Sequence, residues 1–127
     1  MPIAAWCLMI VTLMPILVVG YAKSGGGYDN HKPREGLDRM EAKKRRAYDA
    51  HLNCYEALPV FIAALFVAVW TEGPQTMVDG FSVGFVLFRV LYVLAYITNQ
   101  ATLRSAVWSL AYLCAIGLFV SGFWATA

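Results

Sequence analysis

Four long apolar runs restrict what this chain can fold into more than any other feature. They cover residues 2–22, 57–70, 81–97 and 106–124. About 20 helical residues cross a hydrocarbon core of ~30 Å, and a helix satisfies its own backbone groups there. The runs lack the alternation of apolar and polar residues that a β-barrel strand shows. The chain is 60% hydrophobic, and a water-soluble domain of this size could not bury that much apolar surface. We therefore expect an all-α, integral, multi-pass membrane protein with four transmembrane helices.

The first run also has features of a signal peptide, because Gly20 and Ala22 offer a cleavage-like spacing. However, no Lys or Arg precedes it, and it is long for a signal core, so a membrane span is the better reading. We expect the whole chain, residues 1–127, to form a single membrane domain. The expected spans are residues 2–22, 50–70, 80–98 and 105–124, with a connecting loop at residues 23–46.

The second run is too short to cross a membrane by itself. Residues 57–70 would reach only about 21 Å as a helix. Gly73 and Pro74 end the helix on one side, so the missing length must come from the other. Asn53 and Glu56 are thereby drawn below the membrane interface. We expect one long helix that begins near residue 36 and ends at Trp70.

Basic residues predict the orientation of the spans. Eight of the ten Lys and Arg residues lie between Lys23 and Arg46, whereas residues 71–80 contain none. The positive-inside rule then places the first loop in the cytoplasm and both termini on the non-cytoplasmic side. The net charge of +2 is explained by this topology, so nucleic-acid binding is not expected. Three cysteines in apolar segments, with no CxxC spacing, argue against a disulfide framework.

Two segments carry polar side chains at matching helical offsets of 0, 3, 7 and 10, which form one stripe within about 80° of arc. The stripes are Arg46, Asp49, Asn53 and Glu56 in the second segment, and Arg89, Tyr92, Tyr96 and Asn99 in the third. His51 lies to one side of the first stripe. Exposing Arg89 to lipid would cost roughly 2.5–3.5 kcal/mol, so it should face protein or water. We expect a Glu56–Arg89 ion pair, supported by Asn53 and Tyr92.

Such a pair can serve only to fix the register of two helices. The surrounding polar groups favour a second interpretation, in which the stripes line an interfacial pocket for a polar, anionic ligand. Arg104, at the turn into the fourth span, is either a topology anchor or an electrophilic group at the mouth of the pocket. A guanidinium beside a thiol favours the thiolate, which is the nucleophilic form.

The segments "AHLNCYEALPVF" and "RVLYVLAYITNQATLRS" resemble the MAPEG superfamily, the membrane-associated proteins of eicosanoid and glutathione metabolism, and its bacterial branch in particular. The resemblance implies a homotrimer of left-handed four-helix bundles in the bacterial inner membrane, with glutathione between neighbouring subunits. It also implies a lipophilic second substrate from the bilayer. Asn53, Glu56, Tyr92 and Tyr96 match glutathione-contacting positions, Arg89 matches a buried arginine, and Arg104 matches the arginine that activates the thiol.

Two departures from the family pattern bear on catalysis. Asp49 stands where glutathione-using members often have an arginine, and Arg46 is the nearest substitute. The spacing from Tyr96 to Arg104 is one residue longer than in the leukotriene-forming synthases, which rotates a helical position by about 100°. The predicted binding residues are Arg46, Asp49, His51, Asn53, Glu56, Arg89, Tyr92 and Tyr96, the predicted catalytic residue is Arg104, and no metal site is expected.

Three functions are compatible with four spans and an intramembrane carboxylate. The favoured one is a glutathione-dependent membrane transferase or peroxidase that acts on lipophilic electrophiles. The alternative is a non-catalytic binding or scaffold protein of the same fold. A small multidrug-type transporter fits poorly, because such transporters carry the carboxylate in the first span and residues 2–22 are uncharged.

Overall fold

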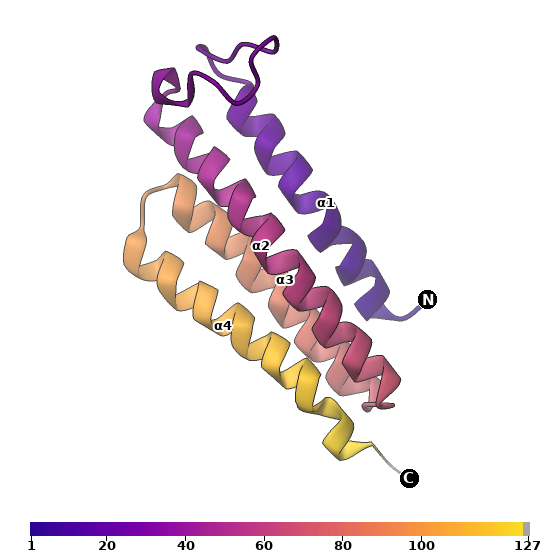
Figure 1. Ribbon diagram of the computed structural model, residues 1–127. Helices are drawn as coiled ribbons and strands as arrows, with labels where there is room; N and C mark the ends of the chain where they lie inside the picture. The colour runs from indigo at the N-terminus through magenta and orange to yellow at the C-terminus, as the bar shows by residue number, and fades with distance from the viewer. Residues whose placement is uncertain (126–127) are drawn as a thin grey trace.

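The computed structural model describes residues 1–125 and is a bundle of four long helices, each antiparallel to the next along the chain (Figure 1). Their bounds are α1 (Ile3–Lys23), α2 (Ala42–Trp70), α3 (Gln75–Ile97) and α4 (Ala101–Val120), with short 3-10 turns η1 (Leu37–Arg39) and η2 (Ser121–Trp124). All four helices are long and apolar enough to cross a membrane. No strand occurs within the described residues, so the prediction of an all-α membrane bundle is confirmed.

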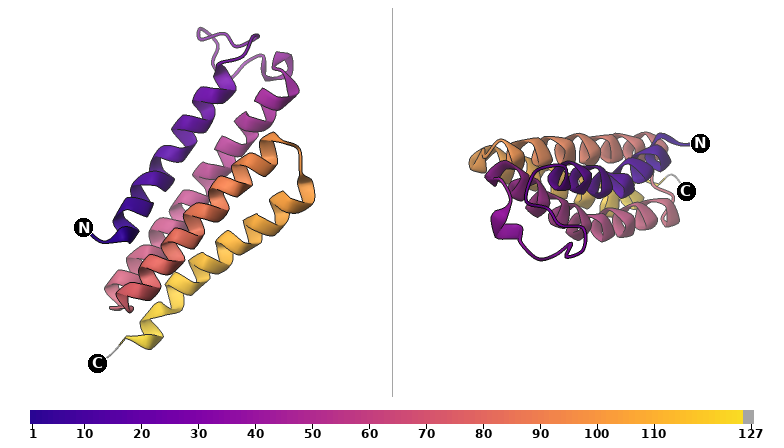
Figure 2. Two further views of the ribbon diagram at one scale, coloured as in Figure 1. Left: turned by 180° about the vertical axis from the view of Figure 1, so that it is seen from behind. Right: turned by 90° about the horizontal axis from the view of Figure 1, so that it is seen from above.

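The two ends of the bundle differ in composition. The basic segment between α1 and α2 and the turn between α3 and α4 lie at one end, and both termini lie at the other with the α2–α3 turn (Figures 1 and 2). We refer to the first as the loop end. The polar residues at the start of α2 and at the finish of α3 therefore meet at the loop end.

The start of α2 differs from the prediction of one helix from residue 36. The chain forms the 3-10 turn η1, becomes extended at Met40 and Glu41, and enters α2 only at Ala42. Near η1, Glu35 pairs with Lys32 at 3.2 Å and Asp38 approaches Arg45 at 3.6 Å. Both pairs are exposed, and such pairs stabilise by less than about 1 kcal/mol, too little to hold a regular helix there.

The α2–α3 turn ends α2 in the way the sequence predicts. The amide of Gly73 donates to the carbonyl of Ala68 at 2.9 Å, and that of Glu72 donates to Val69 at 3.1 Å. Glu72 adopts a left-handed φ of 56°, which completes a Schellman motif. Pro74 follows immediately and caps α3. Helix α2 therefore ends at Trp70, the residue at which the second span is predicted to end.

A second Schellman motif ends α3. The amide of Gln100 donates to the carbonyl of Ala95 at 2.8 Å, and that of Asn99 donates to Tyr96 at 3.1 Å. Asn99 has a φ of 60°, a conformation that asparagine tolerates better than most residues. Asn99 therefore terminates the helix and does not extend the polar stripe of α3, contrary to the prediction.

Small and aromatic side chains fill the interior near the termini. Phe61 of α2 stacks on Phe85 of α3 with ring centroids 4.5 Å apart, and both are fully buried. Four buried alanines allow the backbones of α2 and α4 to approach closely: Ala64, Ala68, Ala111 and Ala115. This packing sets the rotation of each helix about its axis.

Asp79 links the beginning of α1 to α3. Its Oδ1 accepts a hydrogen bond from the backbone amide of Ala4 at 2.8 Å and another from the Gln75 side chain at 3.0 Å. The first amides of a helix lack partners within the helix, and the residue before α1, Pro2, supplies no side-chain cap. The predicted third span begins at residue 80 and leaves Asp79 in the connection before it. In the structure α3 begins at Gln75 and includes Asp79.

Candidate functional site

Arg89 is the centre of the polar contacts at the α2–α3 interface. Its side chain is 1% exposed, as expected for a charge that avoids lipid. Nη2 donates to Oδ1 of Asn53 at 2.9 Å and lies 3.9 Å from the Cys54 sulfur. Its Cζ lies 4.2 Å from the centroid of the Tyr92 ring. Arg89 thus joins one polar residue of α2 to one aromatic residue of α3.

The predicted Glu56–Arg89 ion pair is wrong. Glu56 is exposed, and its Oε2 accepts a hydrogen bond from the Asn53 amide at 2.8 Å. Asn53 and Glu56 differ by about 60° around the helix axis, and in the structure Asn53 is the one turned toward Arg89. The Asn53 side chain bridges the two charged groups, because its Oδ1 accepts from Arg89 and its Nδ2 donates to Glu56. Within residues 1–125, Nη1 of Arg89 has no hydrogen-bond partner.

Arg46 holds the two polar segments together at the loop end. Its Nε donates to the carbonyl of Ile97 at 3.0 Å, which is a favourable place for a cation because α3 ends there. The adjacent Arg45 pairs with Asp49 at 3.2 Å. Asp49 is the carboxylate that departs from the family pattern, and this pair offsets its charge locally.

Arg104 lies beside the aromatic residues of α3. Its Cζ is 4.5 Å from the centroid of the Tyr96 ring, and that ring meets Tyr92 edge-on with centroids 5.8 Å apart. A pocket of about 400 Å³ opens here between α3 and α4. It is lined by Tyr92, Arg104, Ser105, Trp108 and Ser109. We call this the Arg104 pocket.

His51 lies away from both groups. It is 7% exposed, and its Nδ1 contacts the carbonyl of Tyr48. It faces a cleft of about 540 Å³ between α1, α2 and the basic loop, which we call the α1–α2 cleft. The lining residues are Val19, Lys23, Pro33, Arg34, Tyr48, His51, Leu52 and Tyr55. Within one chain, His51 is therefore not brought together with Asn53 and Arg89.

Sequence reasoning did not single out Lys23 and Arg34 of the α1–α2 cleft. Neither makes an ion pair within the described part of the chain, and Lys23 Nζ lies 5.0 Å from the centroid of the Tyr28 ring. Both lie in the segment of residues 23–46, whose positive charge the positive-inside rule accounts for without any ligand. Only the fold places two of these cations beside the buried His51.

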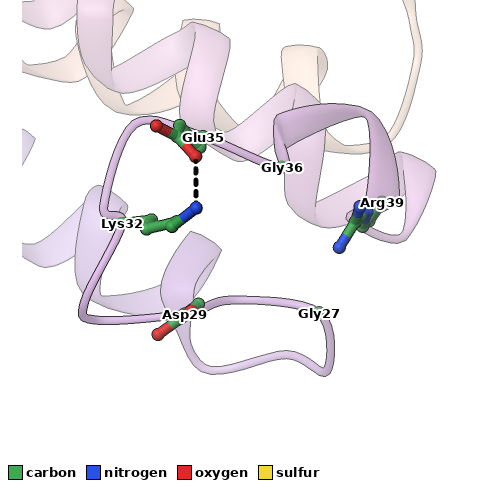
Figure 3. Close-up of a pocket in the computed structure, with 6 residues that line it drawn as sticks. All are labelled: Gly27, Asp29, Lys32, Glu35, Gly36 and Arg39. Carbon is green, nitrogen blue, oxygen red and sulfur yellow. Dashed lines mark ion pairs between the residues drawn. The ribbon is translucent and has the colours of Figure 1, made fainter.

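A further hollow lies within the basic loop itself (Figure 3). It has a volume of about 140 Å³, and the Lys32–Glu35 pair crosses one side of it. Gly27 and Gly36 adopt φ values of 89° and 74°, which glycine reaches without strain. The hollow is much smaller than the other two and is separate from the predicted site residues.

The family model described as the MAPEG family matches residues 3–124, which include all four long helices. A search of curated proteins finds no match. The family match therefore rests on the whole bundle, including both polar segments and Arg104.

Proposed function

The chain belongs to the MAPEG family of membrane proteins, and on this premise we propose that it is a glutathione-dependent transferase or peroxidase that acts on lipophilic electrophiles. The family includes such enzymes as well as non-catalytic members. The observation that carries the proposal is the Arg104 pocket, where Arg104 and Tyr92 line one hollow with room for a thiol and an acceptor. Arg104 is the proposed catalytic residue.

The chemistry requires glutathione as its thiolate. The Arg104 guanidinium would stabilise the sulfur anion, and the Tyr96 ring 4.5 Å from Cζ holds the guanidinium by a cation–π contact. In conjugation, the thiol loses its proton to solvent, the sulfur forms a bond to the electrophilic carbon, and the leaving group departs with its electron pair. Positioning and charge stabilisation supply the catalysis, and the enzyme forms no covalent intermediate.

We further propose that the tripeptide is held between subunits of a homotrimer. Exposed Glu56 lies on a membrane helix, where a carboxylate needs a charged partner, and within the described residues it has a hydrogen bond only from the neutral Asn53 amide. The α1–α2 cleft presents Lys23, Arg34 and His51 on another side of α2. Glutathione carries an amino group and two carboxylates. Glu56 of one subunit would bind the amino group, and the cations of a neighbouring cleft would bind a carboxylate.

The remaining predicted residues have supporting roles in this proposal. Arg89 is too buried to contact the tripeptide directly, so we assign it the positioning of Asn53 and, through it, of Glu56. Arg46 fixes the end of α3 on which Tyr96 lies. Because the basic residues gather at the loop end, we propose that this end faces the cytoplasm and that both termini lie on the opposite side. The family resemblance implies that the membrane is a bacterial inner membrane.

A non-catalytic binding protein is the second candidate. The half-buried position of Arg104 over the Tyr96 ring favours it, because the same contact would stabilise the bundle in a protein without chemistry. The two candidates share the binding site for the tripeptide. They differ in whether the bound thiol is ionised.

Titration with glutathione separates these candidates. Detergent-solubilised protein should gain thermal stability at millimolar glutathione and show the ultraviolet absorbance of a thiolate. Arg104→Ala should remove the absorbance and retain most of the stabilisation, whereas Arg39→Ala, an exposed arginine of the basic loop, should retain both. Stabilisation without thiolate in the parent protein would favour the binding role, and no stabilisation would eliminate both. Turnover that survives Arg104→Ala would refute the catalytic assignment.

A further inference from the structure

The α1–α2 cleft has cations at one level and apolar side chains at another. Lys23 is the last residue of α1, so it lies at the loop end, where the connecting segment also brings Arg34 to the cleft. Val19 lies one turn of α1, about 6 Å, further from the loop end. Leu52 and Tyr55 line the cleft further along α2, and both are exposed. The cleft therefore extends from cations at the end of the spans to apolar side chains within them.

The two cations of the cleft have no acidic residue among the side chains that line it. Neither Lys23 nor Arg34 makes an ion pair within residues 1–125, and the Lys23 ammonium lies over the neutral Tyr28 ring. Other cations of the same segment, such as Lys32 and Arg45, do pair with carboxylates. Two uncompensated positive charges at a membrane surface attract an anionic headgroup.

Aromatic rings on successive turns of α2 form one wall of the cleft. The His51 ring meets Tyr48 edge-on with centroids 4.5 Å apart, and meets Tyr55 edge-on at 6.0 Å. Tyr48 and His51 are buried, whereas Tyr55 is 49% exposed, as suits a tyrosine at the boundary between polar and apolar surroundings. The cleft volume of about 540 Å³ is within the range of about 300–1,000 Å³ typical of sites for small molecules.

From this arrangement we propose that the α1–α2 cleft binds the headgroup of an anionic phospholipid, of the kind of phosphatidylglycerol, from the leaflet at the loop end. Lys23 and Arg34 would bind the phosphate, and the acyl chains would begin against Val19, Leu52 and Tyr55. Basic pockets between transmembrane helices bind anionic headgroups through the same combination. A zwitterionic lipid fits less well, because its own cation would lie beside two others.

A lipid in this cleft would exclude a glutathione carboxylate from the same cations. In the proposed function, Lys23 and Arg34 of a neighbouring subunit bind that carboxylate, and two anions that share them would repel each other. Anionic phospholipid should therefore raise the Kd of glutathione, so that the lipid composition of the membrane regulates the site. Only this competition rests on the proposed function, and the lipid site itself does not.

Native mass spectrometry of the full-length protein in detergent counts bound lipids and tests the site. Phosphatidylglycerol, phosphatidylcholine and inorganic phosphate are added in separate titrations. Lys23→Gln combined with Arg34→Gln should weaken the binding of phosphatidylglycerol by about thirtyfold, the effect of two basic residues at an anionic surface. The charge-preserving pair, Lys23→Arg with Arg34→Lys, should retain most of the binding.

The matched control is Arg39→Gln combined with Lys43→Gln. It removes the same charge from two exposed residues of the same segment that do not line the cleft, and it should change binding less than about twofold. Equal weakening by the two glutamine pairs would indicate a general attraction of the segment to anionic lipid and would overturn the site. Phosphatidylcholine that binds as tightly as phosphatidylglycerol, or inorganic phosphate that displaces the lipid at equal concentration, would overturn it as well.

A glutathione titration of the parent protein tests the competition. Phosphatidylglycerol should raise the Kd of glutathione several-fold, and phosphatidylcholine should leave it unchanged. A Kd that phosphatidylglycerol does not alter would overturn the competition, and the count of bound lipids would still decide the lipid site. An absence of glutathione binding with either lipid and without lipid would refute the proposed function, again without bearing on the lipid count.

Discussion

Replacement of Asn53 by alanine tests the polar contact at the centre of the bundle most directly. The substitution removes the acceptor that lies 2.9 Å from Nη2 of Arg89, whose side chain is 1% exposed. Within the described residues, the other groups near the guanidinium are the Cys54 sulfur at 3.9 Å and the Tyr92 ring at 4.2 Å. The charge would therefore stay buried with only weak partners.

The magnitude follows from these contacts. Losing the acceptor of a hydrogen bond from a charged donor costs about 1.5–3 kcal/mol, and the upper end applies here because the guanidinium is buried. The cation–π contact with Tyr92 is present in both proteins, so it does not alter this difference. We therefore expect Asn53→Ala to lower the free energy of unfolding by about 3 kcal/mol. Glu56→Ala removes an exposed acceptor from the Asn53 amide and should lower it by about 1 kcal/mol or less.

The assay is unfolding of detergent-solubilised protein by dodecyl sulfate, followed by circular dichroism. A double variant, Asn53→Ala with Arg89→Met, serves as the control, because it removes the buried charge together with its partner. It should be more stable than Asn53→Ala alone. If Asn53→Ala is as stable as Glu56→Ala, or if the double variant shows no recovery, the Arg89–Asn53 contact does not stabilise the bundle.

Three further predictions concern the ends of the helices. Asp79→Ala should lower the melting temperature because the Ala4 amide loses its cap, at a cost of about 1 kcal/mol, and Asp79→Asn should restore most of the loss. Gly73→Ala should destabilise by about 1–3 kcal/mol, since a β-carbon there would overlap the Ser121 hydroxyl, and pairing it with Ser121→Gly should recover stability in the same melts. Asn99→Ala should cost about 1 kcal/mol at its φ of 60° whereas Asn99→Gly should not, and equal melting temperatures for the two variants would contradict the left-handed cap.

The arrangement of the helices was predictable because it depends on large energies. Four runs of apolar residues have no stable place except a membrane, and Gly73 with Pro74 leaves α2 no way to continue. The cost of exposing Arg89 to lipid required it to point inward, and it does. In each case the alternative structure would cost several kcal/mol. Differences in side-chain packing are smaller than that, so they do not change the outcome.

The candidate site was less predictable because it depends on small differences. Whether Asn53 or Glu56 faces Arg89 is decided by a helix rotation of about 60°, which distant packing such as Phe61 on Phe85 sets. The spacing of polar residues along the sequence is compatible with either residue facing Arg89. Trp108 was missed for a related reason, because an aromatic residue in an apolar span looks the same whether it faces lipid or lines a pocket.

The contact between Ala4 and Asp79 has a consequence for how the protein is made. The two partners are 75 residues apart, a gap that synthesis at roughly 5–20 residues per second fills in ~4–15 s. During that interval the newly inserted first helix lacks the carboxylate that will anchor its start, so we expect its final docking to await the third helix. Crosslinking of ribosome-stalled chains can check this order, and a first helix already locked in its final position in chains that end before residue 75 would contradict it.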